Sequence, residues 1–177
     1  KRQFHPKVIF LKGKKAYLIT GSFNLTIAGW SSNRECVVIK EITNRENALQ
    51  VVEFFSKLNP KKSDTAAINK WANSLPDTKP NWKFAHNYNT DNFINEIKGK
   101  ELTVWSPYFS KKTSELLSEI KKSGFTKINL VPDISQSQKI KIMPAELQKI
   151  VDDKAVEIQV DRSIIKEKQP LFHAKVW

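Results

Sequence analysis

Apolar residues in the first third of the chain form short runs that alternate with polar turns. Residues 8–11 and 16–20 are runs of this kind. The polar turn between them is Lys12-Gly13-Lys14-Lys15, and the three segments together predict a β-hairpin. The β-branched run at residues 35–42 predicts a further strand, which we expect to be buried together with Cys36. Apolar residues then recur at helical spacing, which predicts a helix on the sheet: Ala48, Val51, Val52, Phe55 and Leu58. Thr43 and Glu46 fit a capping box at its start.

The pattern changes at residue 59. Residues 59–81 contain three prolines and little periodicity, so we expect a connector with a short helix near residues 66–75. A second α/β unit begins near Lys83. The predicted elements are a helix at 91–97, a strand at 102–105, a helix that stops at Gly124, a strand at 127–131, a helix at 144–151 and a strand at 156–160. Alternating strands and helices predict a layered α/β or α+β fold.

Charge and composition narrow the class of partner. Thirty Lys and Arg against eighteen Asp and Glu give a net charge of +12, which favours polyanions, nucleic acid before an anionic membrane surface. No apolar run approaches the length of a membrane span, so we expect a soluble, cytoplasmic protein with no stable membrane association. The single cysteine excludes an internal disulfide, and neither cysteine nor histidine spacing predicts a metal site.

A short sequence occurs near both ends of the chain. Phe4-His5-Pro6-Lys7-Val8 reappears as Phe172-His173-Ala174-Lys175-Val176, each time at the start of an apolar run. Residues two apart in a strand point to the same side, so each copy presents an imidazole and an ammonium together. An imidazole serves as nucleophile or acid–base near neutral pH, and a lysine stabilises charge on a phosphate oxygen.

Two further motifs lie between the first copy and the predicted helix. In Gly21-Ser22-Phe23-Asn24, the glycine lets the backbone approach closely, and Ser22 and Asn24 offer neutral donors to phosphate oxygens. In Asn33-Arg34-Glu35, Glu35 could hold an imidazole in one tautomer. The catalytic candidates are therefore His5, Lys7, Asn24, His173 and Lys175, with Ser22 and Glu35 in support.

These ordered motifs resemble the phospholipase D superfamily, the HKD proteins, and are most similar to its bacterial nuclease branch. The aspartate of the HKD name is missing, and Lys12 stands where it would fall. The second motif matches only in its His-x-Lys part. The resemblance implies two similar lobes, each a mixed β-sheet flanked by helices, with the active site between them. It also implies that one histidine forms a covalent phosphohistidine, that the other is the general acid, and that no metal or cofactor is needed. The assignment of His5 as the nucleophile follows only from the usual arrangement in this family.

The resemblance also predicts how the chain divides. Residues 1–58 would form the C-terminal half of a first lobe, 59–82 a linker, and 83–177 the N-terminal half of a second lobe. The chain would then be an interior piece of a longer nuclease, completed by other segments of the same protein or by a homodimer. A second Gly-Ser-x-Asn about 15 to 20 residues after His173, at the spacing of the first copy, would establish a two-motif enzyme.

The expected function is metal-independent cleavage of nucleic acid, and DNA is favoured over RNA as the substrate. A phospholipid-active phospholipase or phosphatidyltransferase and a catalytically silent nucleic-acid-binding module remain as alternatives. Four lysines that bracket a predicted helix could follow a phosphate backbone: Lys111, Lys112, Lys121 and Lys122. His86 has no partner motif, so we expect a structural or exposed residue. Most of the tryptophans are expected to pack in the core or an interface.

Overall fold

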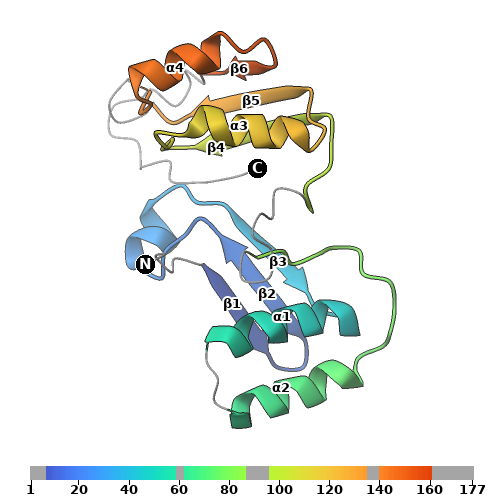
Figure 1. Cartoon of the computed structure of the whole chain (residues 1–177). Helices are drawn as coiled ribbons and strands as arrows, with labels where there is room; N and C mark the ends of the chain where they lie inside the picture. The colour runs from blue at the N-terminus through green and yellow to red at the C-terminus, as the bar shows by residue number, and fades with distance from the viewer. Residues whose placement is uncertain (1–6, 59–61, 87–95, 135–139, 161–177) are drawn as a thin grey trace. The chain divides into compact units, whose positions relative to one another are not determined.

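The structure is a computed structural model that describes residues 7–58, 62–86, 96–134 and 140–160. These residues form a mixed α/β arrangement with two three-stranded sheets, β1-β2-β3 and β4-β5-β6 (Figure 1). The chain divides into two compact units, and their segments interleave in the sequence. One comprises Val8–Thr20 and Val38–Glu96, and the other comprises Lys1–Lys7, Gly21–Val37 and Ile97–Trp177. The prediction of a mixed α/β class is confirmed at this level.

The first sheet begins with the predicted hairpin. Strands β1 (Val8–Lys12) and β2 (Ala16–Gly21) pair antiparallel, with Val8 opposite Thr20 and Lys12 opposite Ala16. Strand β3 (Val37–Glu41) lies next to β2. Two backbone hydrogen bonds flank this pairing, from Ser22 to Cys36 and from Ile42 to Ala16. As the chain advances through β2 from residue 16 to 22, the bonded partners go back from residue 42 to 36. This order indicates antiparallel neighbours.

The prediction of a buried third strand is wrong. The strand is shorter than residues 35–42, and its apolar side chains are open, with Val37 47% and Ile39 61% exposed. Cys36 precedes the strand and is half-buried. The hydrophobic core here is built from the hairpin, Ile42 and the helices, and none of its residues comes from β3. A β-branched run therefore indicated a strand correctly but not its burial, because burial depends on what packs against the strand.

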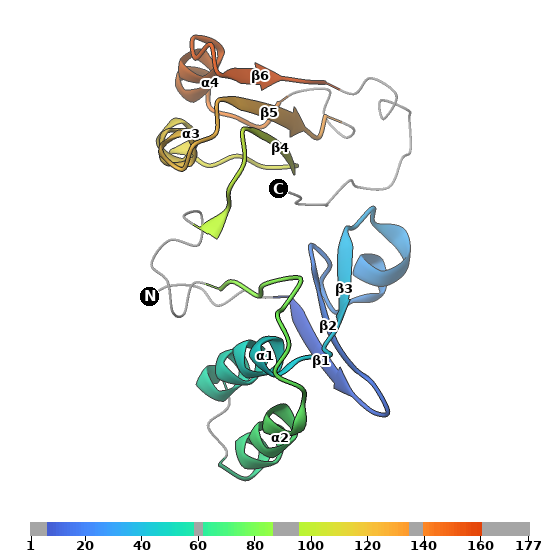
Figure 2. The same cartoon turned by 90° about the vertical axis from the view of Figure 1, so that its right-hand side faces the viewer.

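Helix α1 (Arg45–Leu58) carries the main apolar face of this unit. Ala48 and Val51 are fully buried against the hairpin residues Ala16 and Leu18, and α1 lies beside the hairpin in both views (Figures 1 and 2). The expected capping box of Thr43 and Glu46 is wrong by one residue. The helix begins after Asn44, whose Oδ1 accepts the Asn47 N–H at 2.9 Å, while its amide donates to Asn47 Oδ1 at 2.7 Å. Asparagine caps a helix as well as threonine does, so neighbouring candidates are hard to separate by sequence.

The expected connector is partly helical and packs on the first unit. Helix α2 (Lys62–Ser74) contacts α1, and its Ala72 is fully buried in the same core. The following segment returns to α1, where the buried Asn47 amide donates to the Trp82 carbonyl at 2.8 Å. The described residues of 59–82 therefore help to build a core. The assignment of the flanking regions to two similar lobes stays a prediction.

The second sheet is parallel. Strands β4 (Glu101–Ser106), β5 (Lys127–Pro132) and β6 (Val156–Ile158) lie in that order, and the connections contain α3 (Thr113–Lys122) and α4 (Pro144–Val151). Successive right-handed crossovers in one direction place both helices on the same face, as Figure 2 shows. The predicted helix stop is confirmed, since Gly124 follows α3 with a φ of 103°. The helix expected at 91–97 lies almost wholly outside the described residues.

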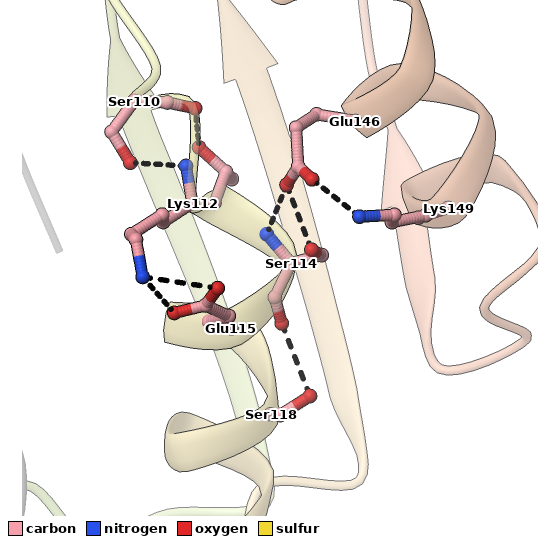
Figure 3. A network of polar contacts seen from close by, with 8 residues as sticks. Ser110, Lys112, Ser114, Glu115, Ser118, Glu146 and Lys149 are labelled. Carbon is pink, nitrogen blue, oxygen red and sulfur yellow. Dashed lines mark hydrogen bonds and ion pairs between the residues drawn. The ribbon is translucent and has the colours of Figure 1, made fainter.

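A carboxylate on α4 fixes the start of α3 (Figure 3). Glu146 is 7% exposed, and its Oε2 accepts the backbone N–H of Ser114 at 3.1 Å and the Ser114 hydroxyl at 2.7 Å. Its Oε1 accepts from Lys149 at 2.8 Å. These contacts lower the pKa of Glu146 to about 2, and the hydrogen bond from Lys149 contributes more than those from Ser114. An acidic group at a helix N-terminus satisfies exposed N–H groups and favours the helix dipole.

The depressed pKa predicts an acid-dependent loss of stability. Since the folded-state pKa lies below the ordinary value of 4.5, the ionised carboxylate stabilises the fold above that value. The contribution disappears as the pH falls toward about 2. In Glu146→Gln, the unfolding temperature should therefore change less steeply with pH across this window than in the unmodified protein. Thermal unfolding followed by circular dichroism measures both curves.

Glu115→Gln is the matched control, because Glu115 lies on α3 itself and pairs at the surface with Lys112. Its curve should stay parallel to that of the unmodified protein. Parallel curves for Glu146→Gln as well would contradict the assigned contact.

Candidate phosphate-binding site

The loop between β2 and β3 begins with a close backbone approach. A Cβ on Gly21 would lie 2.1 Å from the Cys36 carbonyl oxygen, so only glycine fits at this position. The neighbouring Ser22 donates its backbone N–H to the same oxygen at 3.0 Å, and the Cys36 N–H donates to Ser22 Oγ at 3.0 Å. The two ends of the loop are thereby joined by both backbone and side-chain contacts.

Glu35 is held on both of its oxygens at this junction. Ser22 Oγ donates to Oε2 at 2.5 Å, and the amide of Asn33 donates to Oε1 at 3.3 Å. Ser22 is only 2% exposed, so its hydroxyl proton supports Glu35, whereas the sequence suggested that it faces a phosphate. A carboxylate has lone pairs beyond these two bonds, so Glu35 can still accept from an imidazole.

Asn33 is a residue that the candidate set missed. Its backbone is extended, with φ −81° and ψ 155°, so its side chain and that of Glu35 point to the same side. The Asn-x-Glu spacing carried this signal, because residues two apart in extended backbone share a side.

Lys7 lies within electrostatic range of this carboxylate. Burial lowers the pKa of Lys7 from its usual value, and the negative charge of Glu35 raises it in part. Lys7 precedes β1, whose residues Val8 and Phe10 pack against the helix-covered core. A partly desolvated cation in the field of a fixed carboxylate is suited to binding a phosphate oxygen.

Asn24 lies in a loop whose backbone is tightly packed. A Cβ on Gly29 would lie 2.3 Å from the Asn24 carbonyl oxygen, and that oxygen accepts the Thr26 N–H at 2.8 Å. The loop continues as a π-helical turn, η1 (Ala28–Ser32), closed by the Asn33 N–H to the Ala28 carbonyl at 2.7 Å. Short π-helical turns occur frequently at functional sites. The Gly-Ser-x-Asn and Asn-x-Glu motifs are thus parts of one local structure.

Three of the five catalytic candidates, His5, His173 and Lys175, lie outside the described residues. The meeting of two imidazole–ammonium pairs stays a prediction.

Two of the four lysines at the ends of α3 pair with carboxylates of that helix. Lys112 pairs with Glu115, and Lys122 pairs with Glu119.

The remaining two helix lysines differ from each other. Lys121 forms an ion pair with Asp153, while Lys111 is exposed. Three of the four lysines thus have a neighbouring negative charge, which weakens the case for a continuous basic track. Their binding to nucleic acid stays a prediction.

Of the remaining aromatic candidates, His86, Trp71 and Trp82 are packed, whereas Trp30 is exposed. His86 packs on Phe54 at 5.1 Å and Phe84 at 5.5 Å between ring centroids, and burial lowers the pKa of His86, as suits a structural residue. Trp71 and Trp82 pack against the core of the first unit, as expected. Trp30 does not, because 59% of it is exposed.

Residues 7–58, 62–86, 96–134 and 140–160 include no group of three or more His, Cys, Asp or Glu side chains placed to hold a metal ion. Among these same residues, no helix is long and apolar enough to cross a bilayer.

No family model, curated protein or solved structure matches this chain.

Proposed function

We propose that this protein is a metal-independent phosphodiesterase with a phospholipase D-like fold that cleaves nucleic acid, DNA before RNA. The observation that carries the proposal is the cluster around Glu35. Ser22 and Asn33 fix this carboxylate, and its charge acts on the cation of Lys7. A phosphodiesterase site needs a fixed cation for the phosphate and a group that orients the attacking imidazole. The net charge of +12 favours a polyanionic substrate.

The proposed reaction has two displacements at phosphorus. A ring nitrogen of His5 attacks, the P–O bond to the leaving nucleoside breaks, and His173 gives that oxygen a proton. Water, deprotonated by His173, then breaks the P–N bond and regenerates His5. Lys7, Lys175 and Asn24 stabilise the charge on the non-bridging oxygens, and Glu35 accepts the imidazole N–H that holds His5 in position.

A cleavage assay with a labelled oligonucleotide tests the proposal. Cleavage should persist in EDTA and disappear in His5→Ala, and quenching with denaturant at alkaline pH during turnover should trap a phosphate on His5 that acid then releases. Full activity of His5→Ala, or cleavage that EDTA abolishes, would refute the mechanism. His86→Ala serves as the control histidine, since His86 packs among phenylalanine rings.

A further inference from the structure

Large apolar side chains are exposed on the loop that carries Asn24. Leu25 is 83%, Ile27 85% and Trp30 59% exposed. Large side chains of this kind are normally covered, and an exposed cluster next to polar groups marks an interaction surface. We call these three side chains the apolar tip.

Trp30 is held in place despite its exposure. The buried Phe23 ring meets it edge-on, with centroids 5.3 Å apart and an angle of 69° between the planes. The backbone N–H of Trp30 donates to the Thr26 carbonyl at 3.1 Å, and the adjacent Gly29 packs against the Asn24 backbone. The indole and Asn24 are therefore fixed to each other by one short loop.

We propose that Trp30 stacks on an unpaired nucleobase next to the phosphate bound at Lys7 and Asn24. The inference rests on the proposed function and narrows its substrate class to single-stranded nucleic acid, or to strands with unstacked bases. A tryptophan can stack on any base because every base has a π-face. In a duplex those faces are already stacked on neighbouring base pairs, so the indole gains contact only with an unpaired base.

The charges around the loop favour nucleic acid over a lipid surface. Residues 22–33 contain neither Lys nor Arg, and Arg34 follows them directly. Peptide segments that lie on anionic membranes combine an apolar face with many basic residues. Single-strand nucleic-acid sites, in contrast, combine base-stacking aromatic rings with a positively charged surface for the backbone, and the chain has a net charge of +12.

Fluorescence anisotropy with a labelled single-stranded oligonucleotide and its duplex tests the inference. Trp30→Ala should weaken single-strand binding by about tenfold and leave duplex binding unchanged. Trp30→Phe, which retains a ring, should keep most of the affinity. Tyr108→Ala is the matched control, because Tyr108 is an exposed aromatic residue on another loop, 49% exposed. An oligonucleotide with abasic sites should bind the unmodified protein and Trp30→Ala equally well.

The outcomes separate this inference from the proposed function. Equal losses for single strand and duplex, or no loss in Trp30→Ala, would overturn base stacking and leave the nuclease proposal intact. Failure of the unmodified protein to bind either form would refute both proposals. Vesicles of anionic phospholipid provide the third arm. Binding to them that Trp30→Ala removes, with oligonucleotide binding unchanged, would assign the apolar tip to lipid and overturn the inference.

Discussion

Replacing Lys7 by methionine should lower the rate of phosphodiester cleavage by about 10²- to 10³-fold, as expected when a charge that stabilises the transition state is removed. Methionine keeps an unbranched apolar stem, so the packing beside β1 changes little. The fold should therefore persist, as unfolding curves will show. Single-turnover cleavage of a labelled oligonucleotide measures the effect on the chemical step. Lys14→Met removes the same charge from the exposed hairpin turn and should leave the rate unchanged. A similar loss in both variants would indicate a general electrostatic effect.

The pH dependence of the cleavage rate provides a second test of Lys7. Lys7 acts as an ammonium, and burial lowers its pKa, so activity should fall on the alkaline side before an ordinary lysine would lose its proton. The charge of Glu35 raises the pKa of Lys7. Glu35→Gln removes this attraction and should move the alkaline limb of the pH–rate profile to lower pH. An unmoved limb would indicate that Lys7 does not titrate in that range.

Gly21→Ala should destabilise the protein by about 2 kcal/mol, within the range found for side chains forced into packed space. The new methyl group would lie 2.1 Å from the Cys36 carbonyl oxygen and 3.1 Å from the Phe23 ring. The carbonyl is backbone, so relief requires the β2 and β3 ends to separate. The Ser22–Cys36 hydrogen bonds would then weaken, and Glu35 would lose its fixed position. Chemical denaturation measures the stability, and cleavage should fall in the same variant.

Gly13→Ala is the matched control. A Cβ on Gly13 meets only the Lys15 carbonyl oxygen, at an ordinary 3.9 Å. This variant should have nearly the stability and activity of the unmodified protein. Equal stability of the Gly21 and Gly13 variants would show that the loop tolerates separation of its ends.

Local sequence patterns predicted most of the described elements. The hairpin, helix α1, and the alternating elements from β4 to β6 follow from periodicity and turn residues, which act over a few neighbours. The patterns were weaker where burial depends on distant segments. Val37 and Ile39 have the composition of a core strand but are exposed, and Trp30 is open where packing was expected. In each case the covering surface is a tertiary property.

The candidate site divides in the same way. The order and spacing of motifs along the chain made Lys7, Asn24 and Glu35 candidates, and their role at a phosphate stays a prediction. They did not show that Ser22 is buried and gives its proton to Glu35, or that Asn33 holds the other carboxylate oxygen.

By itself, the sequence determined the basic charge, the strand and helix periods and the residue types available for phosphate chemistry. Only the tertiary structure decided which of those residues touch. The close approach of Gly21 to Cys36 joins the two ends of a loop, and Ser22 there bonds both Cys36 and Glu35. Hydrogen bonds between residues far apart in sequence depend on backbone geometry, which residue identity alone does not specify.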